Sequence, residues 1–234
     1  MLPKIEYPVF KIFIPITKKE LSFRVMTLKE EKIILTAQEN KNIIDLMDAM
    51  LICIQNCSIN NKVDFTKLPF FELQLIYLNL RSNSIGAISK LLIPDDYEKL
   101  FKHEVSVNIE NINLNMDNLM EENIIKFTEE SGMVMKYPDF YTIRKINKIT
   151  NETDKVISFI RSCIKSIFDA TNVYNEDSFS EEELEKYIDE LPSFYFNLLK
   201  NFIDNIPKIE YIIEYKNSKE EPKRLVLNNL ENFT

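Results

Sequence analysis

Only two of the 234 residues are glycine, Gly86 and Gly132, and they stand far apart in the chain. Phosphate-binding loops need several glycines close together, because their backbone takes positive φ angles and lies directly against the ligand. This scarcity argues against folds built around such loops. Each glycine follows a polar stretch and precedes alternating residues. We therefore expect a positive-φ turn or a close backbone approach at both positions.

Few residues are candidates for acid–base or metal chemistry. The single histidine, His103, has no nucleophile or second ligand near it in the sequence, and most imidazole chemistry requires one. Cys53 and Cys57 have the spacing of half a metal site, but this pattern is more typical of core cysteines on an apolar helix face. The carboxylate pairs Glu30-Glu31 and Asp95-Asp96 are typical of a helix start and of a turn. We expect no catalytic, cofactor-binding or metal-binding residues, and hence no enzyme.

The composition is that of an ordinary globular protein, with 45% hydrophobic and 28% charged residues. No apolar run is long enough to span a membrane, and the first residues lack a signal-peptide pattern. Three cysteines fit a reducing cytosol better than a disulfide framework. The net charge of −8 argues against non-specific binding to nucleic acid. We expect a protein that stays where it is made and binds neither nucleic acid nor membrane.

The negative charge is concentrated in residues 172–204, which hold nine acidic residues against two lysines, a net charge of −7. One interpretation is a helix face exposed to solvent. The other is a surface that binds a basic partner. On the second interpretation, the partner-binding residues are Glu181, Glu182, Glu185 and Asp189.

The hydrophobic periodicity predicts an α+β fold with terminal hairpins and a helical core from both halves of the chain. Alternation in VFKIFIP and KELSFRV predicts an opening hairpin, and three helices complete residues 1–84. Alternation returns in residues 85–137, which we expect to form a small antiparallel sheet. Helices and a closing hairpin fill residues 138–234, including one helix from Val156 to Ile167. We expect the first and last parts to share one domain.

Two capping boxes mark helix starts within this pattern. Thr27 with Glu30 and Ser180 with Glu183 have the spacing at which a hydroxyl and a carboxylate satisfy each other's backbone amides. The apolar residues on either side of the second box have the spacing of a hydrophobic staple. The second box therefore predicts a helix start within the acidic stretch.

Several segments together resemble the baseplate hub assembly proteins, or baseplate hub subunits, of T4-type contractile-tailed phages. The segments LPKIEYPVFKIFIP, KELSFR and TLKEEKIIL are similar to the family's opening strand pair and first helix start. LPFFELQLIYLNLRSNSIG, which includes Gly86, and SKLLIPDDYEK follow. GMVMKYP, which ends with Tyr137 and Pro138, is the most specific segment. FSEEELEKYIDELP and FIDNIPKIEYIIEY resemble the C-terminal helix pair and strand, so the resemblance runs nearly end to end.

The resemblance implies a role in building the central hub of a phage tail baseplate, with hub proteins as partners. We expect an assembly factor that binds a hub protein transiently in the host cytoplasm. A structural hub subunit kept in the tail of the virion is the alternative, and a tail-associated cell-wall hydrolase is a more remote one. The oligomeric state stays open. We expect structural roles for Thr27, Glu30, Gly86, Gly132, Tyr137, Pro138, Ser180 and Glu183.

Overall fold

The computed structural model describes residues 3–60, 62–95, 102–116 and 123–227. The chain forms two compact units, the first from Met1–Asn115 with Lys208–Thr234 and the second from Met116–Pro207. Each unit combines helices with small antiparallel sheets, which confirms the predicted α+β class. The division differs from the three predicted parts, because strands from residues 85–137 occur in both units.

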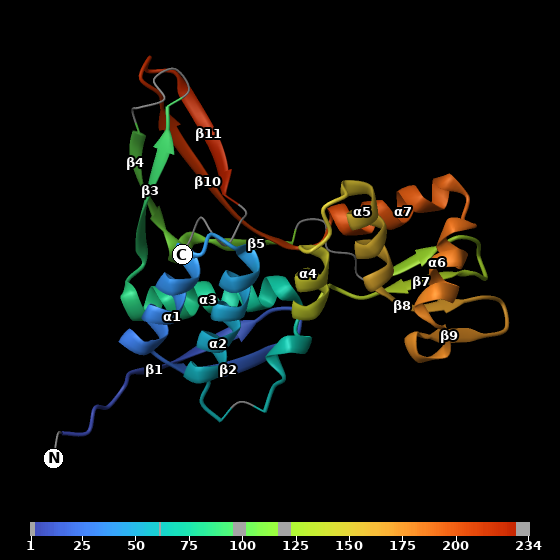
Figure 1. The fold of residues 1–234 in the computed structure, drawn as a ribbon, viewed down its shortest axis with the longest axis horizontal. Helices are drawn as coiled ribbons and strands as arrows, with labels where there is room; N and C mark the ends of the chain where they lie inside the picture. Colours follow the sequence, from blue (N-terminus) through green and yellow to red (C-terminus); the bar gives the residue numbers. More distant parts are fainter. Residues whose placement is uncertain (1–2, 61, 96–101, 117–122, 228–234) are drawn as a thin grey trace. The chain divides into compact units, whose positions relative to one another are not determined.

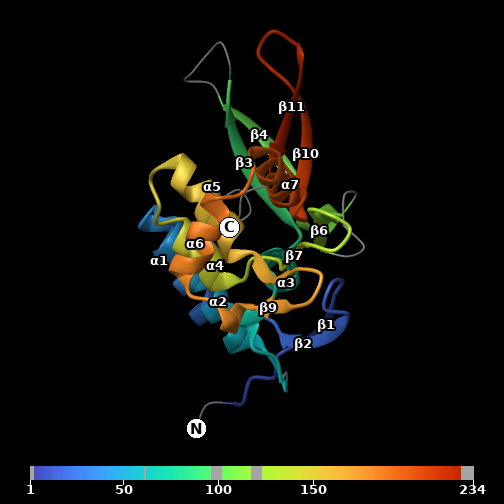
Figure 2. The ribbon, with the colours of Figure 1, turned by 90° about the vertical axis from the view of Figure 1, so that its right-hand side faces the viewer.

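Three helices form the middle of the first unit, between the opening hairpin and a second group of strands (Figures 1 and 2). They are α1 (Leu28–Glu39), α2 (Ile43–Cys57) and α3 (Phe70–Ile85), with a 3-10 turn, η1 (Phe65–Lys67), between the last two. Helix α2 is apolar over most of its circumference and packs on both other helices. It therefore forms the centre of this unit's core.

The opening hairpin forms as predicted, with β1 (Val9–Ile14) antiparallel to β2 (Lys19–Arg24). A carboxylate from α3, Glu72, holds the turn between the two strands. It is fully buried and accepts hydrogen bonds from the backbone nitrogens of Ile16 and Thr17, at 2.7 and 3.0 Å, and from the Thr17 hydroxyl. A buried carboxylate is costly unless it is hydrogen-bonded, so these three donors explain why α3 can carry it.

The first predicted capping box is confirmed at the start of α1, where Thr27 and Glu30 cap each other. Glu30 is only 1% exposed and also accepts two hydrogen bonds from Arg24 of β2, at 3.0 and 3.2 Å. Burial alone raises the pKa of Glu30, but the hydrogen bonds from Arg24 and Thr27 outweigh it and lower the pKa to about 2. The charged carboxylate therefore ties the hairpin to the helix.

The remaining strands of the first unit form two hairpins that lie side by side (Figures 1 and 2). One consists of β3 (Ile88–Pro94) and β4 (Lys102–Asn108), and the other of β10 (Lys208–Lys216) and β11 (Pro222–Leu227), the predicted closing hairpin. Strand β10 also pairs with β5 (Asn113–Asn115), which follows the 3-10 turn η2 (Ile109–Asn111). Strands from the middle of the chain and strands near its C-terminus thus belong to the same unit.

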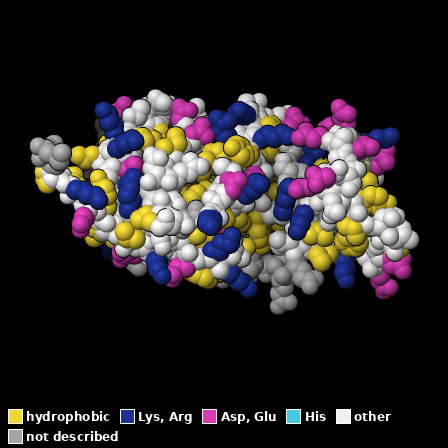
Figure 3. Space-filling view, turned by 90° about the horizontal axis from the view of Figure 1, so that it is seen from below, with side chains coloured by type: hydrophobic (Ala, Val, Ile, Leu, Met, Phe, Trp, Pro, Cys, Tyr) yellow, Lys and Arg dark blue, Asp and Glu magenta, His cyan; other side chains and the backbone are white. Residues whose placement is uncertain are grey.

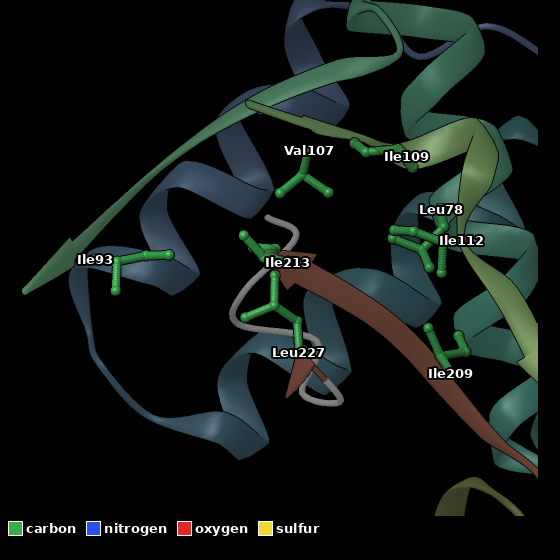
Figure 4. Packing of buried hydrophobic residues seen from close by; sticks show 8 residues of the cluster. All are labelled: Leu78, Ile93, Val107, Ile109, Ile112, Ile209, Ile213 and Leu227. Atoms are coloured by element: carbon green, nitrogen blue, oxygen red, sulfur yellow. The ribbon is translucent and has the colours of Figure 1, made fainter. Parts of the chain in front are cut away.

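The inner faces of these hairpins share a core of aliphatic side chains, drawn in Figure 4. Val107 of β4, Ile213 of β10 and Leu227 of β11 point toward one another in its middle. The full cluster consists of Leu78, Ile93, Val107, Ile109, Ile112, Ile209, Ile213 and Leu227. Because Leu78 belongs to α3, the same core attaches the hairpins to the helices.

A buried polar contact joins the two hairpins. Asp95, which directly follows β3, accepts hydrogen bonds from the backbone nitrogen and hydroxyl of Ser218, at 2.8 and 2.9 Å. Its second oxygen also lies 2.7 Å from Nε2 of His103 on β4, and the His103 ring packs on Tyr215. The two hairpins are therefore held together by hydrogen bonds as well as by their apolar faces.

The second unit is built on one antiparallel sheet with the order β6-β7-β8-β9. Its strands are β6 (Ile124–Lys126), β7 (Gly132–Met135), β8 (Ile164–Phe168) and β9 (Val173–Asn175). Its helices are α4 (Phe140–Ile146), α5 (Glu152–Ser162), α6 (Glu181–Asp189) and α7 (Ser193–Asp204), with a 3-10 turn, η3 (Glu176–Ser178), before α6. Helix α5 packs on α4 and α7.

Two predictions about secondary structure were wrong. The apolar run from Val156 to Ile167 is not one helix, because α5 ends at Ser162 and β8 begins at Ile164. A continuous apolar run does not distinguish a buried strand from a helix by periodicity alone. The strands of residues 85–137 also do not form one central sheet, because β3–β4, β5 and β6–β7 belong to three different sheets.

Each glycine shows one of the two expected features, a positive φ at Gly86 and a close backbone approach at Gly132. Gly86 ends α3 with φ 127° and ψ 156°, a backbone conformation that is open essentially only to glycine. Gly132 has no positive φ, but a Cβ atom there would lie 2.3 Å from the carbonyl oxygen of Ile125 on β6. Close packing of β7 on β6 therefore excludes a side chain at this position.

Candidate partner-binding surface

Helix α6 carries the predicted acidic residues and begins at the second predicted capping box. The Ser180 hydroxyl accepts from the Glu183 backbone nitrogen at 3.1 Å, and the Glu183 carboxylate accepts from the Ser180 nitrogen at 2.7 Å. Hydrogen bonds from the backbone nitrogen and the side chain of Ser180 to the Glu183 carboxylate lower its pKa. Leu184 and Ile188 form the buried stripe, so the acidic side chains lie outside it on the exposed circumference of the helix.

The four predicted partner-binding residues are all exposed, but they are not equivalent. Glu181 forms an ion pair with Lys145 of α4 at 3.2 Å. Glu185 forms one with Arg161 of α5 at 2.7 Å. Within the part of the chain that the structure describes, Glu182 and Asp189 form no ion pair. These two carboxylates are therefore the ones available to a basic partner.

A groove of about 480 Å³ lies on the other flank of α6, entirely within the second unit. It is lined by residues of β8, β9 and the turns around them on one side and by α6 on the other. The lining residues are Ser131, Ile167, Phe168, Asp169, Tyr174, Ser178, Phe179, Glu183, Leu184 and Tyr187. The predicted hydrophobic staple, Phe179 with Leu184, thus forms part of its wall.

The groove has exposed aromatic side chains in its lining. Tyr174 and Tyr187, both in the lining, are 41% and 40% exposed. Tyrosine is enriched where proteins bind other proteins. On the face of the molecule drawn in Figure 3, hydrophobic side chains are exposed among acidic and basic ones.

The charge that lines the groove is negative. Asp169 closes the β8–β9 turn by accepting from the backbone nitrogens of Thr171 and Asn172, at 2.8 and 2.9 Å, and from the Tyr174 hydroxyl at 3.0 Å. Hydrogen bonds from Thr171, first among these contacts, lower the pKa of Asp169 to about 2. Glu183 is the second carboxylate in the lining, and none of the ten lining residues is basic.

Sequence reasoning identified the acidic helix but missed the groove beside it. One wall of the groove comes from β8 and β9, whereas the apolar periodicity predicts a helix at Ile164 and Ile167. The segment Asp169–Asn172 was the available signal, because an aspartate that binds the amide two residues ahead is typical of a tight turn. A turn at that point would have indicated a hairpin.

The cysteines lie in apolar surroundings. Cys53, Cys57 and Cys163 are all fully buried. Burial raises the pKa of their thiols, to about 12 for Cys53 and Cys163 and to about 11 for Cys57. Such thiols are almost entirely protonated at neutral pH and are poor nucleophiles. These are the surroundings of core cysteines.

The other candidate groups also have local contacts. In the contact of His103, Asp95 and Ser218, the aspartate lies between the other two, and the Ser218 hydroxyl donates to Asp95 rather than to the imidazole. A catalytic triad needs the histidine in the middle position. Asp96 lies outside the described residues. Within the described ranges, no three His, Cys, Asp or Glu side chains are grouped as ligands for a metal ion.

The remaining predicted structural residues lie within the second unit. The Tyr137 ring stacks on Phe202 of α7 with a centroid separation of 5.9 Å, and Pro138 is buried beside it in sequence. Both lie in the short connection between β7 and α4. None of the helices in the described residues has both the length and the apolar character needed to cross a membrane.

Comparison with known proteins gives one family. The family model described as T4 bacteriophage base plate protein matches residues 7–234, which is nearly the whole chain. No curated protein and no solved structure matches this chain. The match extends through both units and includes the residues that form the groove and its acidic border. The chain therefore belongs to the T4 bacteriophage base plate protein family.

Proposed function

We propose that this protein is an assembly factor that binds a baseplate hub protein while the phage tail is built, and that it catalyses no reaction. The observation that carries the proposal is the groove of the second unit, with its exposed tyrosines and ionised carboxylates. Interfaces that form and dissociate are typically of this mixed kind, whereas permanent ones are more apolar. Membership of the base plate family supports a partner among the baseplate proteins.

On this proposal the protein acts in the host cytoplasm and leaves before the particle is complete. The charges around the groove steer the encounter with a basic surface and weaken it at high salt. Two carboxylates of α6 take part in this, because Glu182 and Asp189 form no ion pair within the described residues. Glu181 and Glu185 are instead already paired with Lys145 of α4 and Arg161 of α5.

The proposal is tested by affinity capture of the tagged full-length protein from infected cells. We expect a hub protein to be retained at low salt and released at high salt. The double variant Glu182→Lys with Asp189→Lys should reduce the capture. Glu6→Lys with Glu39→Lys changes the net charge equally, at exposed positions of the first unit, and should not. Equal capture by both variants would show that α6 plays no part.

The non-enzymatic part of the proposal has its own test. The purified protein should release no fragments from host cell walls, at any protein concentration. Fragment release that a single carboxylate variant abolishes would replace the assembly role with that of a tail hydrolase.

A structural subunit is the second candidate, and the outer faces of the first unit's hairpins favour it. Ile212 and Val226 face each other across β10 and β11 and are 45% and 43% exposed. Ile88 and Leu92 of β3 are 66% and 60% exposed. A subunit retained in the virion would bury such apolar faces permanently. Stoichiometric amounts of the chain in purified virions would favour this candidate over the first.

A further inference from the structure

Resting on the proposed role in assembly, we infer that the groove binds a short segment of the partner that places an apolar side chain next to a lysine or arginine. The groove is defined by its two sides. Phe168 of β8 and Tyr174 of β9 form one, and Leu184 and Tyr187 of α6 form the other. Its volume of about 480 Å³ is in the range of sites that enclose several side chains or a small ligand.

The apolar part of the segment follows from the exposed surface of the groove. Tyr174 and Tyr187 lie at its border and keep about two-fifths of their surface in water. Covering these rings with an aliphatic or aromatic side chain removes apolar surface from water without removing any internal hydrogen bond of the groove. A rigid aromatic border also loses little conformational entropy on binding.

The basic part of the segment follows from charge. Asp169 and Glu183 both lie in the lining, and hydrogen bonds hold the pKa of each below its ordinary value. Both are already anchored, Asp169 by its own turn and Glu183 by the Ser180 nitrogen, so neither has to be reoriented to meet a cation. Among the described residues that line the groove, none is a lysine or arginine that could neutralise them. An acidic segment would be repelled by the same two charges.

A direct binding measurement uses the full-length protein and two matched synthetic peptides. One peptide has a central Leu-Phe pair flanked by lysines, and in the other every lysine is replaced by glutamate. We expect the lysine peptide to shift backbone amide NMR signals of residues 167–187. The glutamate peptide should shift none. Raising NaCl from about 50 to about 500 mM should weaken the lysine peptide several-fold.

Two variants distinguish peptide binding in the groove from binding elsewhere on the surface. Tyr187→Ala should weaken the lysine peptide at least about fivefold, since it removes one aromatic wall. Tyr141→Ala is the control, because Tyr141 is 62% exposed on α4 of the same unit and does not line the groove. Equal binding by both variants, or equal binding of both peptides, overturns the inference.

A photo-crosslinking experiment in infected cells identifies the natural occupant. The photoreactive residue p-benzoyl-phenylalanine replaces Tyr187 in one protein and Tyr141 in the other. Crosslinks specific to position 187 should fall in a segment that carries apolar and basic residues together. If that segment lies outside the baseplate proteins, the inference stands and the assembly role fails. If position 187 gives no specific crosslink while the protein still supports tail assembly, the role stands and the inference fails.

Discussion

Among the described residues of the first unit, three carboxylates are buried, and each connects two elements of the fold. Glu72 holds the turn of the opening hairpin, Glu30 binds Arg24, and Asp95 joins the two later hairpins through Ser218. In the second unit, the carboxylates of α6 are exposed, and one of them, Glu183, lines a groove with uncovered aromatic rings. The same type of side chain therefore stabilises one unit and remains available for binding in the other.

The difference follows from the number of donors that each carboxylate meets. Glu72 accepts three hydrogen bonds and Glu30 is held by Arg24 and Thr27, so removing either leaves partly buried donors without this acceptor. Glu182 and Asp189 are exposed to water, so replacing them should change the free energy of unfolding little. Stability should therefore respond to changes in the first group, and partner binding to changes in the second.

The largest expected effect is that of Glu72→Ala. Two backbone amides and the Thr17 hydroxyl would lose their acceptor, so we expect the free energy of unfolding to fall by about 3–5 kcal/mol. Urea denaturation followed by circular dichroism measures this. Glu182→Ala is the matched control and should stay within about 0.5 kcal/mol of the unchanged protein. A similar small effect for both would remove the distinction between the units.

The dependence on pH should come from Glu30. Its pKa is about 2 in the folded protein and near 4.5 when unfolded, so the unfolded chain binds the proton more readily between these values. The stabilisation is complete above pH 4.5 and is lost as the pH falls toward 2, with a total of about 3 kcal/mol. Urea denaturation curves recorded across this pH window give the free energy of unfolding at each pH. In the Glu30→Gln variant this free energy should depend much less on pH. An unchanged pH profile would contradict the role of the Arg24 contact.

A smaller loss is expected at Gly132. In Gly132→Ala the new methyl group would meet the Ile125 carbonyl, and separating β7 from β6 should cost about 2–3 kcal/mol. Hydrogen exchange should show the lost protection in the second unit. At Gly86 nothing lies within 4 Å of a Cβ atom, so Gly86→Ala suffers only from its positive φ, a cost of about 1–2 kcal/mol. The reverse order of effects would show that backbone conformation outweighs the close contact.

The smallest effect is expected for the cap of α6. Ser180→Ala removes the acceptor for the Glu183 amide and should lower the free energy of unfolding by about 1 kcal/mol. Ser180→Asp restores an acceptor and should recover most of this loss. If the alanine variant melts at the original temperature, the groove wall does not depend on its cap.

The features that could be predicted from sequence are local ones. Both capping boxes and both terminal hairpins depend on residues a few positions apart, and all four are present. The partition of the strands could not be predicted, because the pairing of β5 with β10 joins residues about a hundred positions apart. The ion pairs of Glu181 and Glu185 depend on helices placed by tertiary packing, and for this reason the sequence could not separate them from Glu182 and Asp189.

The candidate site likewise depends on contacts between distant residues, and these could not be predicted from the sequence. Its border residues Tyr174 and Tyr187 lie on a strand and a helix that meet only in the folded unit. The acidic stretch indicated one candidate surface for a partner, but finding the apolar wall of the groove depended on recognising β8 as a strand. Charge was visible in the sequence, whereas concave shape was not.

The central claim is that this protein docks on a baseplate protein during assembly and then leaves. Quantitative mass spectrometry of tail intermediates and of purified virions tests it most directly, with a known hub protein as the internal standard. We predict that the chain accompanies the hub protein in the intermediates and is depleted from mature virions. A constant ratio of the two proteins in both samples would contradict the account and identify the chain as a permanent part of the baseplate.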